Sequence, residues 1–361
     1  MAERTVADAT RAAWTSVLGA APLDDDDNFF EAGGDSLSAL ELVTILGDEL
    51  GANVPMAELY RAPTFGALVA LAAGEGDEAD VPTAHHTTGR TLVRLRRGGA
   101  GRLWCFLPPL SGAVTRYAPM PRLLPPGDAI WAMETPAELS GAGMAVLIRG
   151  LADRIAAEDL SAFQTIVLSG YSLGGVFAHE LARELETRLD GPKVVALLLD
   201  PPDPIEFRPS LDDSFDIFVR VGWRIPEPAA SFVDADGGYR LDLVAAAARA
   251  AGTLPAAAPD TEVSDAWTVY ASNARILEGH VVTRGAGLTF MLQCDSDAEV
   301  PAGGWGAAER AKGAWADAVE PEHVNVLRAD HFAMMEPPND QAVGRWLVAS
   351  ADRATALAGI S

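Results

Sequence analysis

The chain has 361 residues, a hydrophobic fraction of 49% and a formal net charge of −24 at pH 7, which leaves room for one large domain and a smaller one. Such a negative charge argues against nucleic acid and anionic membranes as partners held by bulk electrostatics. No apolar run reaches the roughly 18 residues of a membrane span, and residues 1–13 are too polar for a signal peptide, so we expect a cytoplasmic protein without a membrane partner.

The first part of the chain is acidic and helical. Residues 1–76 contain 13 Asp and Glu against 3 Arg, a balance of −10. Apolar residues recur there at helical spacing, which is typical of amphipathic helices. Thr64 follows a proline and suits the N-cap position of the last helix. We therefore predict a small all-α, four-helix domain over residues 1–73, with helices over residues 3–18, 36–50, near 56–60 and 64–72.

A change of composition marks residues 74–90. Glycine, acidic residues, threonine and two histidines replace the apolar periodicity there, which predicts a flexible, charged linker. His85 and His86 are adjacent within this segment, and no further metal-ligating residue lies close to them in the sequence. We interpret them as solvated side chains and expect no metal site.

The remaining residues, 91–361, alternate strand-like apolar runs with amphipathic stretches. This alternation predicts a mostly parallel sheet covered on both faces. A long, mainly helical stretch over about residues 205–277 interrupts it, and we interpret that insertion as a lid. Cys105 and Cys294 lie in strand-like runs, which favours two buried thiols over a disulfide. The predicted strands cover residues 92–95, 103–107, 129–133, 165–169, 194–199, 288–293 and 324–327, and the clearest helices cover residues 145–158, 176–189 and 341–349.

Ser36 stands at the predicted start of a helix, in the run Asp-Asn-Phe-Phe-Glu-Ala-Gly-Gly-Asp-Ser-Leu over residues 27–37. Gly33 and Gly34 allow a sharp turn before it, and a helix N-terminus offers backbone N–H groups to a phosphate. An ordinary serine N-cap is the plainer interpretation. With the four-helix pattern around it, however, the segment resembles a peptidyl carrier domain of a nonribosomal peptide synthetase. The resemblance implies that a phosphopantetheinyl transferase attaches 4′-phosphopantetheine to Ser36, and that the thiol of this group carries an acyl chain.

Ser172 lies in Gly-Tyr-Ser-Leu-Gly over residues 170–174, between an apolar strand and a helix. This run matches the G-x-S-x-G nucleophile elbow of α/β-hydrolases, in which small residues permit a strained turn that exposes the serine oxygen. Such a nucleophile needs an acid and a histidine later in the chain. His331 follows the last predicted strand and is our choice of base. We set aside His85 and His86 in the linker, His179 inside the next helix, His280 at the end of a lid helix, and His323 before a strand.

Three aspartates compete for the place of the acid. Asp200 ends one predicted strand, whereas Asp295 and Asp297 end the next and are also able to reach the imidazole. Residues 91–352 resemble a type I thioesterase domain, an α/β-hydrolase with a helical lid. In nonribosomal synthetases the acid of such domains usually follows the strand before the lid, so the resemblance favours Asp200.

An oxyanion hole completes the expected site. Its donors should be the backbone N–H of Leu173 and one N–H from the loop after an early strand. That loop reads Phe-Leu-Pro-Pro-Leu-Ser-Gly over residues 106–112 and resembles the family's His-Pro-Ala-Gly-Gly loop. Pro108 stands in place of the His, and Ser111 in place of the first Gly. The resemblance implies that Leu110 supplies the second N–H.

The two halves together resemble the terminal carrier–thioesterase didomain of a nonribosomal peptide synthetase. The resemblance implies that an acyl or peptidyl chain passes from the Ser36 arm to Ser172 and leaves by hydrolysis, or by attack of an internal amine or hydroxyl. It also implies upstream synthetase modules, or adenylation and condensation enzymes acting in trans, as partners. Two alternatives stay open: an editing thioesterase that clears misloaded carriers, and a carrier or docking module with a weakly active hydrolase domain.

Overall fold

A computed structural model of the protein describes most of the chain, and we describe only those parts. They are residues 5–29, 32, 36–50, 52, 54, 59, 63–73, 92–99, 101–207, 209–254, 258–285, 287–298, 300–301 and 304–359. The predicted linker, the glycines before Ser36 and most of the predicted turn of helix near residues 56–60 lie outside them. Among the helices of the described parts, none has both the length and the apolar composition of a membrane span.

The N-terminal part is built from helices, as predicted. Thr5 begins the first helix with a capping box, in which its side chain accepts a hydrogen bond from Asp8 N. Thr64 occupies the predicted N-cap and accepts a hydrogen bond from Ala67 N. The helices are α1 (Val6–Leu18), α2 (Ser36–Leu50) and α4 (Phe65–Ala72).

An aromatic cluster forms the centre of this part. Trp14 of α1 is almost fully buried, and Phe29 and Phe65 meet its ring edge-on at centroid distances of 5.2 and 5.9 Å. Leucines of α2 and α4 pack around the same centre. Because aromatic side chains bury large apolar areas, these three rings form a large share of the core of this part.

The second part contains an eight-stranded sheet with the strand order β1-β3-β2-β4-β5-β6-β8-β7. The inner pairs are parallel, whereas the edge strands β1 and β7 pair antiparallel with their neighbours. The predicted mostly parallel sheet is therefore confirmed. The strands are β1 (Leu92–Arg96), β2 (Gly101–Leu107), β3 (Ala129–Met133), β4 (Phe163–Tyr171), β5 (Lys193–Leu199), β6 (Leu288–Cys294), β7 (Trp305–Ala307) and β8 (Val324–Leu327).

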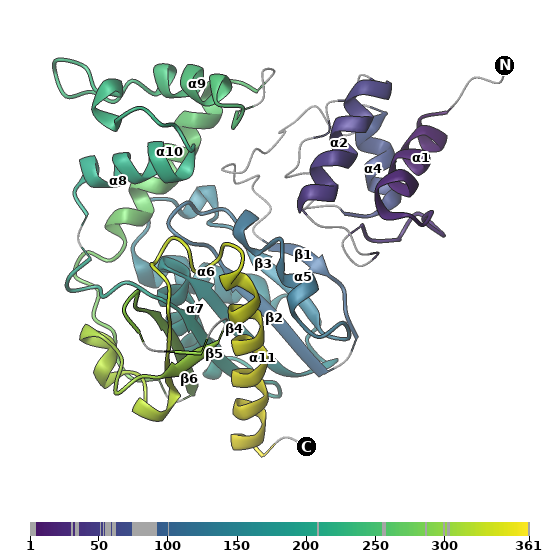
Figure 1. Ribbon diagram of the computed structural model, residues 1–361. Coiled ribbons are helices and arrows are strands. Elements are labelled where there is room, and N and C mark those ends of the chain that lie inside the picture. The colour runs from purple at the N-terminus through teal and green to yellow at the C-terminus, as the bar shows by residue number, and fades with distance from the viewer. Residues whose placement is uncertain are drawn as a thin grey trace.

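The sheet separates two hydrophobic cores, with α6 and α7 on one face and α11 on the other (Figure 1). Alternate residues of one strand enter opposite cores, as Cys105 and Phe106 of β2 do. Cys294 lies in the core on the α11 side. Both cysteines are buried and free, as predicted. The covering helices are α5 (Met120–Leu123), α6 (Met144–Ala156), α7 (Leu173–Glu186) and α11 (Asn339–Leu357).

A helical insertion separates β5 from β6 and lies above one end of the sheet in Figure 1. Stacked and edge-to-face rings hold it together: Phe215 stacks on Tyr239 at 4.2 Å and meets Trp267 at 5.2 Å. The ring of Phe218 lies 5.4 Å from that of Tyr270. The insertion comprises α8 (Leu211–Ile217), a π-helical turn η3 (Phe218–Gly222), α9 (Leu241–Ala250) and α10 (Thr261–Arg275).

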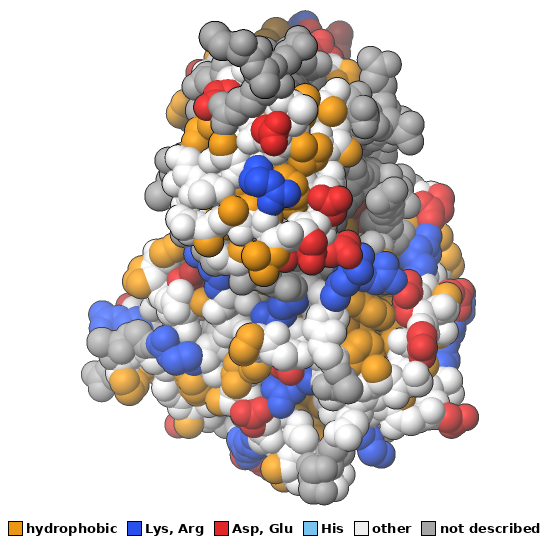
Figure 2. Space-filling view, turned by 90° about the vertical axis from the view of Figure 1, so that its right-hand side faces the viewer, with side chains coloured by type: hydrophobic (Ala, Val, Ile, Leu, Met, Phe, Trp, Pro, Cys, Tyr) orange, Lys and Arg blue, Asp and Glu red, His pale blue; other side chains and the backbone are white. Residues whose placement is uncertain are grey.

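The charged side chains are distributed over the surface. Asp24, Asp25 and Asp26 of the acidic loop before α2 are exposed. On the face drawn in Figure 2, the described acidic and basic side chains lie interspersed among apolar ones. Exposed charges in a mixture of this kind contribute little to stability and keep a protein soluble.

Candidate active site

Ser172 occupies the strained turn between β4 and α7. Its backbone has φ 57° and ψ −129°, a conformation that a residue other than glycine adopts only when its surroundings enforce it. Two hydrogen bonds enforce it here. Ser172 N donates to Leu199 O at 2.9 Å, and Gly175 N donates to Ser172 O at 2.8 Å. The geometry matches the turn predicted from the sequence run.

The two glycines of this run are required by close approaches of the backbone. A Cβ atom on Gly170 would lie 2.1 Å from Gly174 O, and one on Gly174 would lie 2.3 Å from Leu107 O. Both distances are too short for any side chain. Glycine therefore allows the start of α7 to lie directly against the ends of β4 and β2.

His331 lies in the loop after β8, where both its backbone and its ring are held. Tyr171 donates a hydrogen bond from its hydroxyl to His331 O at 2.7 Å, and the two rings stack with centroids 4.9 Å apart. Burial raises the pKa of Tyr171, so its hydroxyl remains a donor. Asp330 stabilises the turn that follows by accepting hydrogen bonds from Phe332 N and Ala333 N, each at 2.9 Å.

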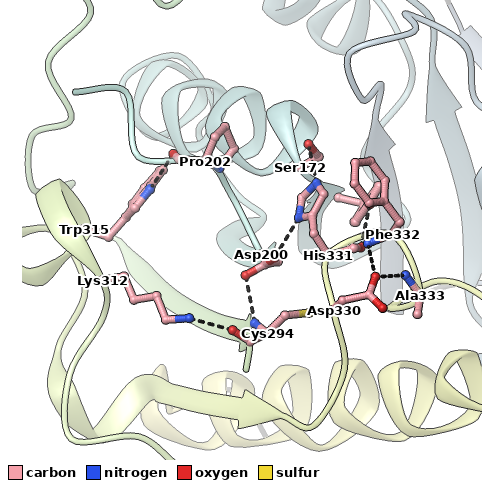
Figure 3. A network of polar contacts seen from close by, with 11 residues as sticks. Ser172, Asp200, Pro202, Cys294, Lys312, Trp315, Asp330, His331, Phe332 and Ala333 are labelled. Carbon is pink, nitrogen blue, oxygen red and sulfur yellow. Dashed lines mark hydrogen bonds and ion pairs between the residues drawn. The ribbon is translucent and has the colours of Figure 1, made fainter. Parts of the chain in front are cut away.

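Asp200, His331 and Ser172 form one hydrogen-bonded chain (Figure 3). Asp200 Oδ2 lies 2.7 Å from His331 Nδ1, and His331 Nε2 lies 3.0 Å from Ser172 Oγ. The second oxygen of Asp200 accepts a hydrogen bond from Cys294 N at 2.8 Å, and Lys312 Nζ donates to Cys294 O at 2.6 Å. With an ionised carboxylate, Nδ1 carries the imidazole proton and Nε2 is free to accept the serine proton.

The two other candidate aspartates are not part of the hydrogen-bonded chain from Asp200 to Ser172. Asp295 and Asp297 are exposed. Asp295 N donates to Leu327 O at 3.0 Å, and Asp297 N donates to Asp295 Oδ1 at 3.0 Å. Neither carboxylate hydrogen-bonds His331 in the described structure.

The other described histidines have different surroundings. His179 is buried in α7, where Nε2 lies 2.8 Å from Thr283 O, and burial lowers its pKa. The sequence placed His280 at the end of a lid helix, but α10 already ends at Arg275 and His280 follows a turn at Gly279 with φ 71°. His323 Nδ1 lies 3.2 Å from Thr289 O. His85 and His86 fall outside the described residues, and within those residues no cluster of three possible metal ligands occurs.

The two predicted oxyanion donors lie at the ends of adjacent elements. Leu173 is the first residue of α7, and the N–H groups of a first helical turn have no acceptor within the helix. Leu110 lies in the loop after β2, and its N–H has no acceptor among the described residues. Tyr117 joins the ends of β4 and β2, which precede α7 and this loop, because its hydroxyl accepts from Tyr171 N at 2.9 Å and donates to Leu107 O at 2.6 Å.

A small cavity of about 130 Å³ opens beside Ser172 and His331. Arg116 also lines it, pairs with Glu336 at 3.2 Å, and places its guanidinium 5.6 Å from the centroid of the Tyr171 ring. A larger groove of about 740 Å³ lies against α10 but does not reach Ser172. The smaller cavity is therefore the candidate binding site for the group that Ser172 attacks. The apolar wall of this smaller cavity includes Leu110, Phe207, Ile217, Val221, Tyr270 and Phe332.

The hydrogen bonds of Tyr117 and Tyr171 were not predicted from the sequence. Tyr171 occupies the variable position of the G-x-S-x-G run, and no local pattern marks Tyr117. Tyr117 and Tyr171 hydrogen-bond backbone groups that lie 54 and 160 positions away in the sequence. Only the assembled sheet brings these partners together.

Ser36 is the first residue of α2, a helix of 15 residues. At the N-terminus of a helix, unpaired N–H groups and the helix dipole favour negative charge such as that of a phosphate. The described backbone therefore fits a phosphopantetheine attachment point.

Two protein families match this chain. Residues 8–72 match the phosphopantetheine attachment site family, and residues 102–347 match the thioesterase domain family. Among curated proteins, chondramide synthase cmdD of Chondromyces crocatus is 30% identical over 191 residues, which is 52% of this chain and 5% of that protein. Enterobactin synthase component F of Escherichia coli K12 is 30% identical over 197 residues, which is 53% of this chain and 15% of that protein.

One known structure resembles nearly the whole chain. It is holo-AB3403, a four-domain nonribosomal peptide synthetase bound to AMP and glycine, with a TM-score of 0.59 and 21% sequence identity. The match covers 96% of this chain and 26% of that one. At this identity the similarity establishes the fold. The chain spans only a small part of the curated relatives that it matches.

Proposed function

Because the chain belongs to the thioesterase domain family and also contains a phosphopantetheine attachment domain, we propose that it holds an acyl or peptidyl group and then releases it, as a step of nonribosomal peptide synthesis. The observation that carries the proposal is the hydrogen-bonded chain from Asp200 through His331 to Ser172, beside an apolar cavity. We take residues 1–73 as the carrier domain, 74–90 as a linker and 91–361 as the thioesterase domain, with a lid over about residues 205–277.

Ser36 is the proposed attachment point of 4′-phosphopantetheine. When bound, this group supplies a terminal thiol that carries the acyl chain as a thioester. The N-terminus of α2 stabilises the phosphate on the Ser36 oxygen. The attachment requires a phosphopantetheinyl transferase as partner. Upstream synthetase modules, or adenylation and condensation enzymes acting in trans, would supply the chain.

Ser172 is the proposed nucleophile. As Oγ attacks the thioester carbonyl, His331 Nε2 accepts its proton across the 3.0 Å contact. Asp200, at 2.7 Å from Nδ1, keeps the imidazole in the required tautomer and stabilises the imidazolium that forms. His331 would then return the proton to the leaving thiolate as the C–S bond breaks, so that the acyl group would remain on Ser172 as an ester.

The oxyanion that develops on the carbonyl oxygen is the main charge to be stabilised. The free N–H groups of Leu173 and Leu110 are its proposed donors. A single preorganised donor of this kind accounts for about 10²- to 10³-fold in kcat. The apolar side chains of the cavity wall would lower the local dielectric around these groups, which would strengthen their interaction with the oxyanion.

Release is the second half of the reaction. A water molecule, or an amine or hydroxyl of the chain itself, attacks the Ser172 ester while His331 accepts its proton. The same three side chains serve this step, because it needs the same proton transfers in the opposite order. The Ser172 oxygen leaves with the proton that His331 returns, so the site is restored.

A second candidate function receives support from the size of the cavity. At about 130 Å³ it is close to the engineered cavity of about 150 Å³ that binds benzene. A short acyl group fits this volume, which favours an editing thioesterase that removes small misloaded groups. Comparing release of acetyl and of longer acyl chains from the carrier separates the two candidates.

The proposal is tested by following an acyl group that is loaded on Ser36 and released by the thioesterase domain of the same chain. A phosphopantetheinyl transferase loads the protein from acetyl-CoA or hexanoyl-CoA, and intact-protein mass spectrometry then follows the acyl mass. We expect this mass to disappear with the appearance of free acid. Retention of both acyl groups for as long as they persist on the heat-denatured protein would contradict the proposed function.

A further inference from the structure

The oxyanion loop receives a hydrogen bond from the helical insertion. Asn273 of α10 is only 1% exposed, and its Nδ2 lies 3.1 Å from Leu110 O and 3.3 Å from Thr135 Oγ1. A buried carboxamide is costly unless it is hydrogen-bonded. The Asn273 NH₂ group therefore donates to both of these acceptors. One of them is the carbonyl oxygen of Leu110, whose N–H is the second proposed oxyanion donor.

A second contact of α10 reaches the same loop. Gly112 has φ 76°, and a Cβ atom on it would lie 2.4 Å from Val269 Cγ1. Val269 precedes Asn273 by one helical turn, so both side chains project from one face of α10. Gly112 N also donates to Pro109 O at 2.9 Å, and Thr135 N donates to Gly112 O at 3.0 Å. The loop is therefore clamped between α10 and the segment after β3.

We propose that Asn273 is a positioning residue that holds Leu110 as an oxyanion donor, so that α10 of the insertion forms part of the catalytic architecture. This inference rests on the proposed function. Asn273 fixes the carbonyl of Leu110 while leaving its N–H free of any acceptor among the described residues. A donor held in this way needs no reorganisation when charge develops on the substrate, which is the source of oxyanion stabilisation.

The same helix also forms part of the substrate cavity. Tyr270 of α10 lines the cavity beside Ser172, and it lies between Val269 and Asn273 in the sequence. A displacement of α10 would therefore open the cavity and release Leu110 together. Because Asn273 acts through Leu110, its loss should cost less than the loss of a donor, about 10- to 100-fold in kcat with little change in KM.

The test compares Asn273→Leu with the control Ser272→Ala. Both changes remove side-chain hydrogen bonds of α10, two from Asn273 and one from Ser272, but Ser272 Oγ accepts from Gly141 N, away from the oxyanion loop. The substrates are p-nitrophenyl butanoate and its thiono analogue, in which C=S replaces C=O. Donors placed for an oxyanion fit the longer C–S bond poorly, so an intact oxyanion hole prefers the oxo ester.

We expect Asn273→Leu to lower kcat for the oxo ester by about 10- to 100-fold and to reduce the ratio of oxo to thiono turnover, whereas Ser272→Ala keeps both near wild type. Equal losses for the two esters, or equal rates for the two variants, would overturn the inference. Asn273→Ser, whose hydroxyl is too short to reach Leu110 O, replaces Asn273→Leu if the latter does not fold. If neither variant folds while Ser272→Ala does, the role of Asn273 is stability and the inference fails.

A further variant separates this inference from the proposed function. Ser172→Ala should abolish hydrolysis of both esters. If it retains wild-type rates, the assigned nucleophile is wrong. If it is inactive while Asn273→Leu behaves like Ser272→Ala, only the role of Asn273 is wrong.

Discussion

Nδ1 of His331 lies 2.7 Å from Oδ2 of Asp200, although 131 positions separate the two residues in the sequence. The parallel sheet accounts for this proximity. Asp200 follows β5 and His331 lies in the loop after β8, and β6 pairs with both strands. The carboxyl ends of parallel strands lie at the same edge of a sheet, where α/β folds place their sites.

This contact leads to a prediction about the acid. Asp200→Asn should keep the fold but disturb the tautomer and orientation of His331, with a loss of up to about 10⁴-fold in kcat by analogy with serine proteases. Asp295→Asn and Asp297→Asn should cost far less, because both side chains are exposed and neither carboxylate hydrogen-bonds His331 in the described structure. Steady-state release rates of the three variants measure the difference.

The two exposed aspartates are matched controls, since each change removes one negative charge close to the end of β6. A severe loss in either of them, together with a nearly normal Asp200→Asn, would move the acid to the loop after β6.

Ser36 should be the only site of pantetheinylation. Treatment with a phosphopantetheinyl transferase and coenzyme A should add one pantetheinyl group, and Ser36→Ala should abolish the addition because no other hydroxyl combines this sequence run with a helix start. Ser38→Ala, two positions along the same helix, serves as the control and should load normally. Intact-protein mass spectrometry gives the answer. Modification of Ser36→Ala would contradict the carrier assignment.

Neither thiol should react while the protein is folded. Burial raises the pKa of Cys105 to about 12, and burial, with Asp200 nearby, raises the pKa of Cys294. Since the thiolate is the reactive form, Ellman's reagent at pH 8 should detect no thiol in the native protein and both of them in denaturant. Rapid reaction of the native protein would show that one of the two cores is open.

Acidification should destabilise the fold partly through His179. Burial lowers the pKa of His179 in the folded state, so the unfolded chain binds more protons as the pH falls below about 6.5. The stability contributed by neutral His179 is thus present above that pH and lost below it, by at most about 1.4 kcal/mol per pH unit. The free energy of unfolding should fall less steeply between pH 7 and pH 5 in His179→Gln than in wild type.

His323 provides an internal control for this comparison. Burial also lowers its pKa, but it is present in both proteins, so the difference between the two slopes reports on His179. Identical slopes would mean that His179 titrates as it does in the unfolded chain.

The sequence predicted those features that depend on local pattern. The apolar runs predicted the inner strands, Thr64 after a proline predicted the helix cap, and the G-x-S-x-G run predicted the strained turn at Ser172. Each of these features follows from neighbouring residues. The edge strand β7 was missed, since its three residues Trp305–Ala307 are too few to show alternation. The contacts of Tyr117, Tyr171 and Asn273 were also missed, because each joins segments far apart in the sequence.

The acid of the triad was only partly predictable from the sequence. Strand ends alone left Asp200, Asp295 and Asp297 as candidates, because the sequence does not state how far each loop carries its side chain. Asp200 has a left-handed backbone conformation, with φ 44°, which places its carboxylate against His331. No local sequence pattern predicts a positive φ in a residue other than glycine.

The proposed function requires that an acyl group on Ser36 leaves through Ser172. The most direct measurement loads wild type and Ser172→Ala with hexanoyl-pantetheine from hexanoyl-CoA and follows both by intact-protein mass spectrometry. We predict that both proteins load equally, that wild type returns to the mass of the pantetheinylated protein, and that Ser172→Ala retains the hexanoyl group, because a triad acts as a unit. Release from Ser172→Ala at the wild-type rate would contradict the account.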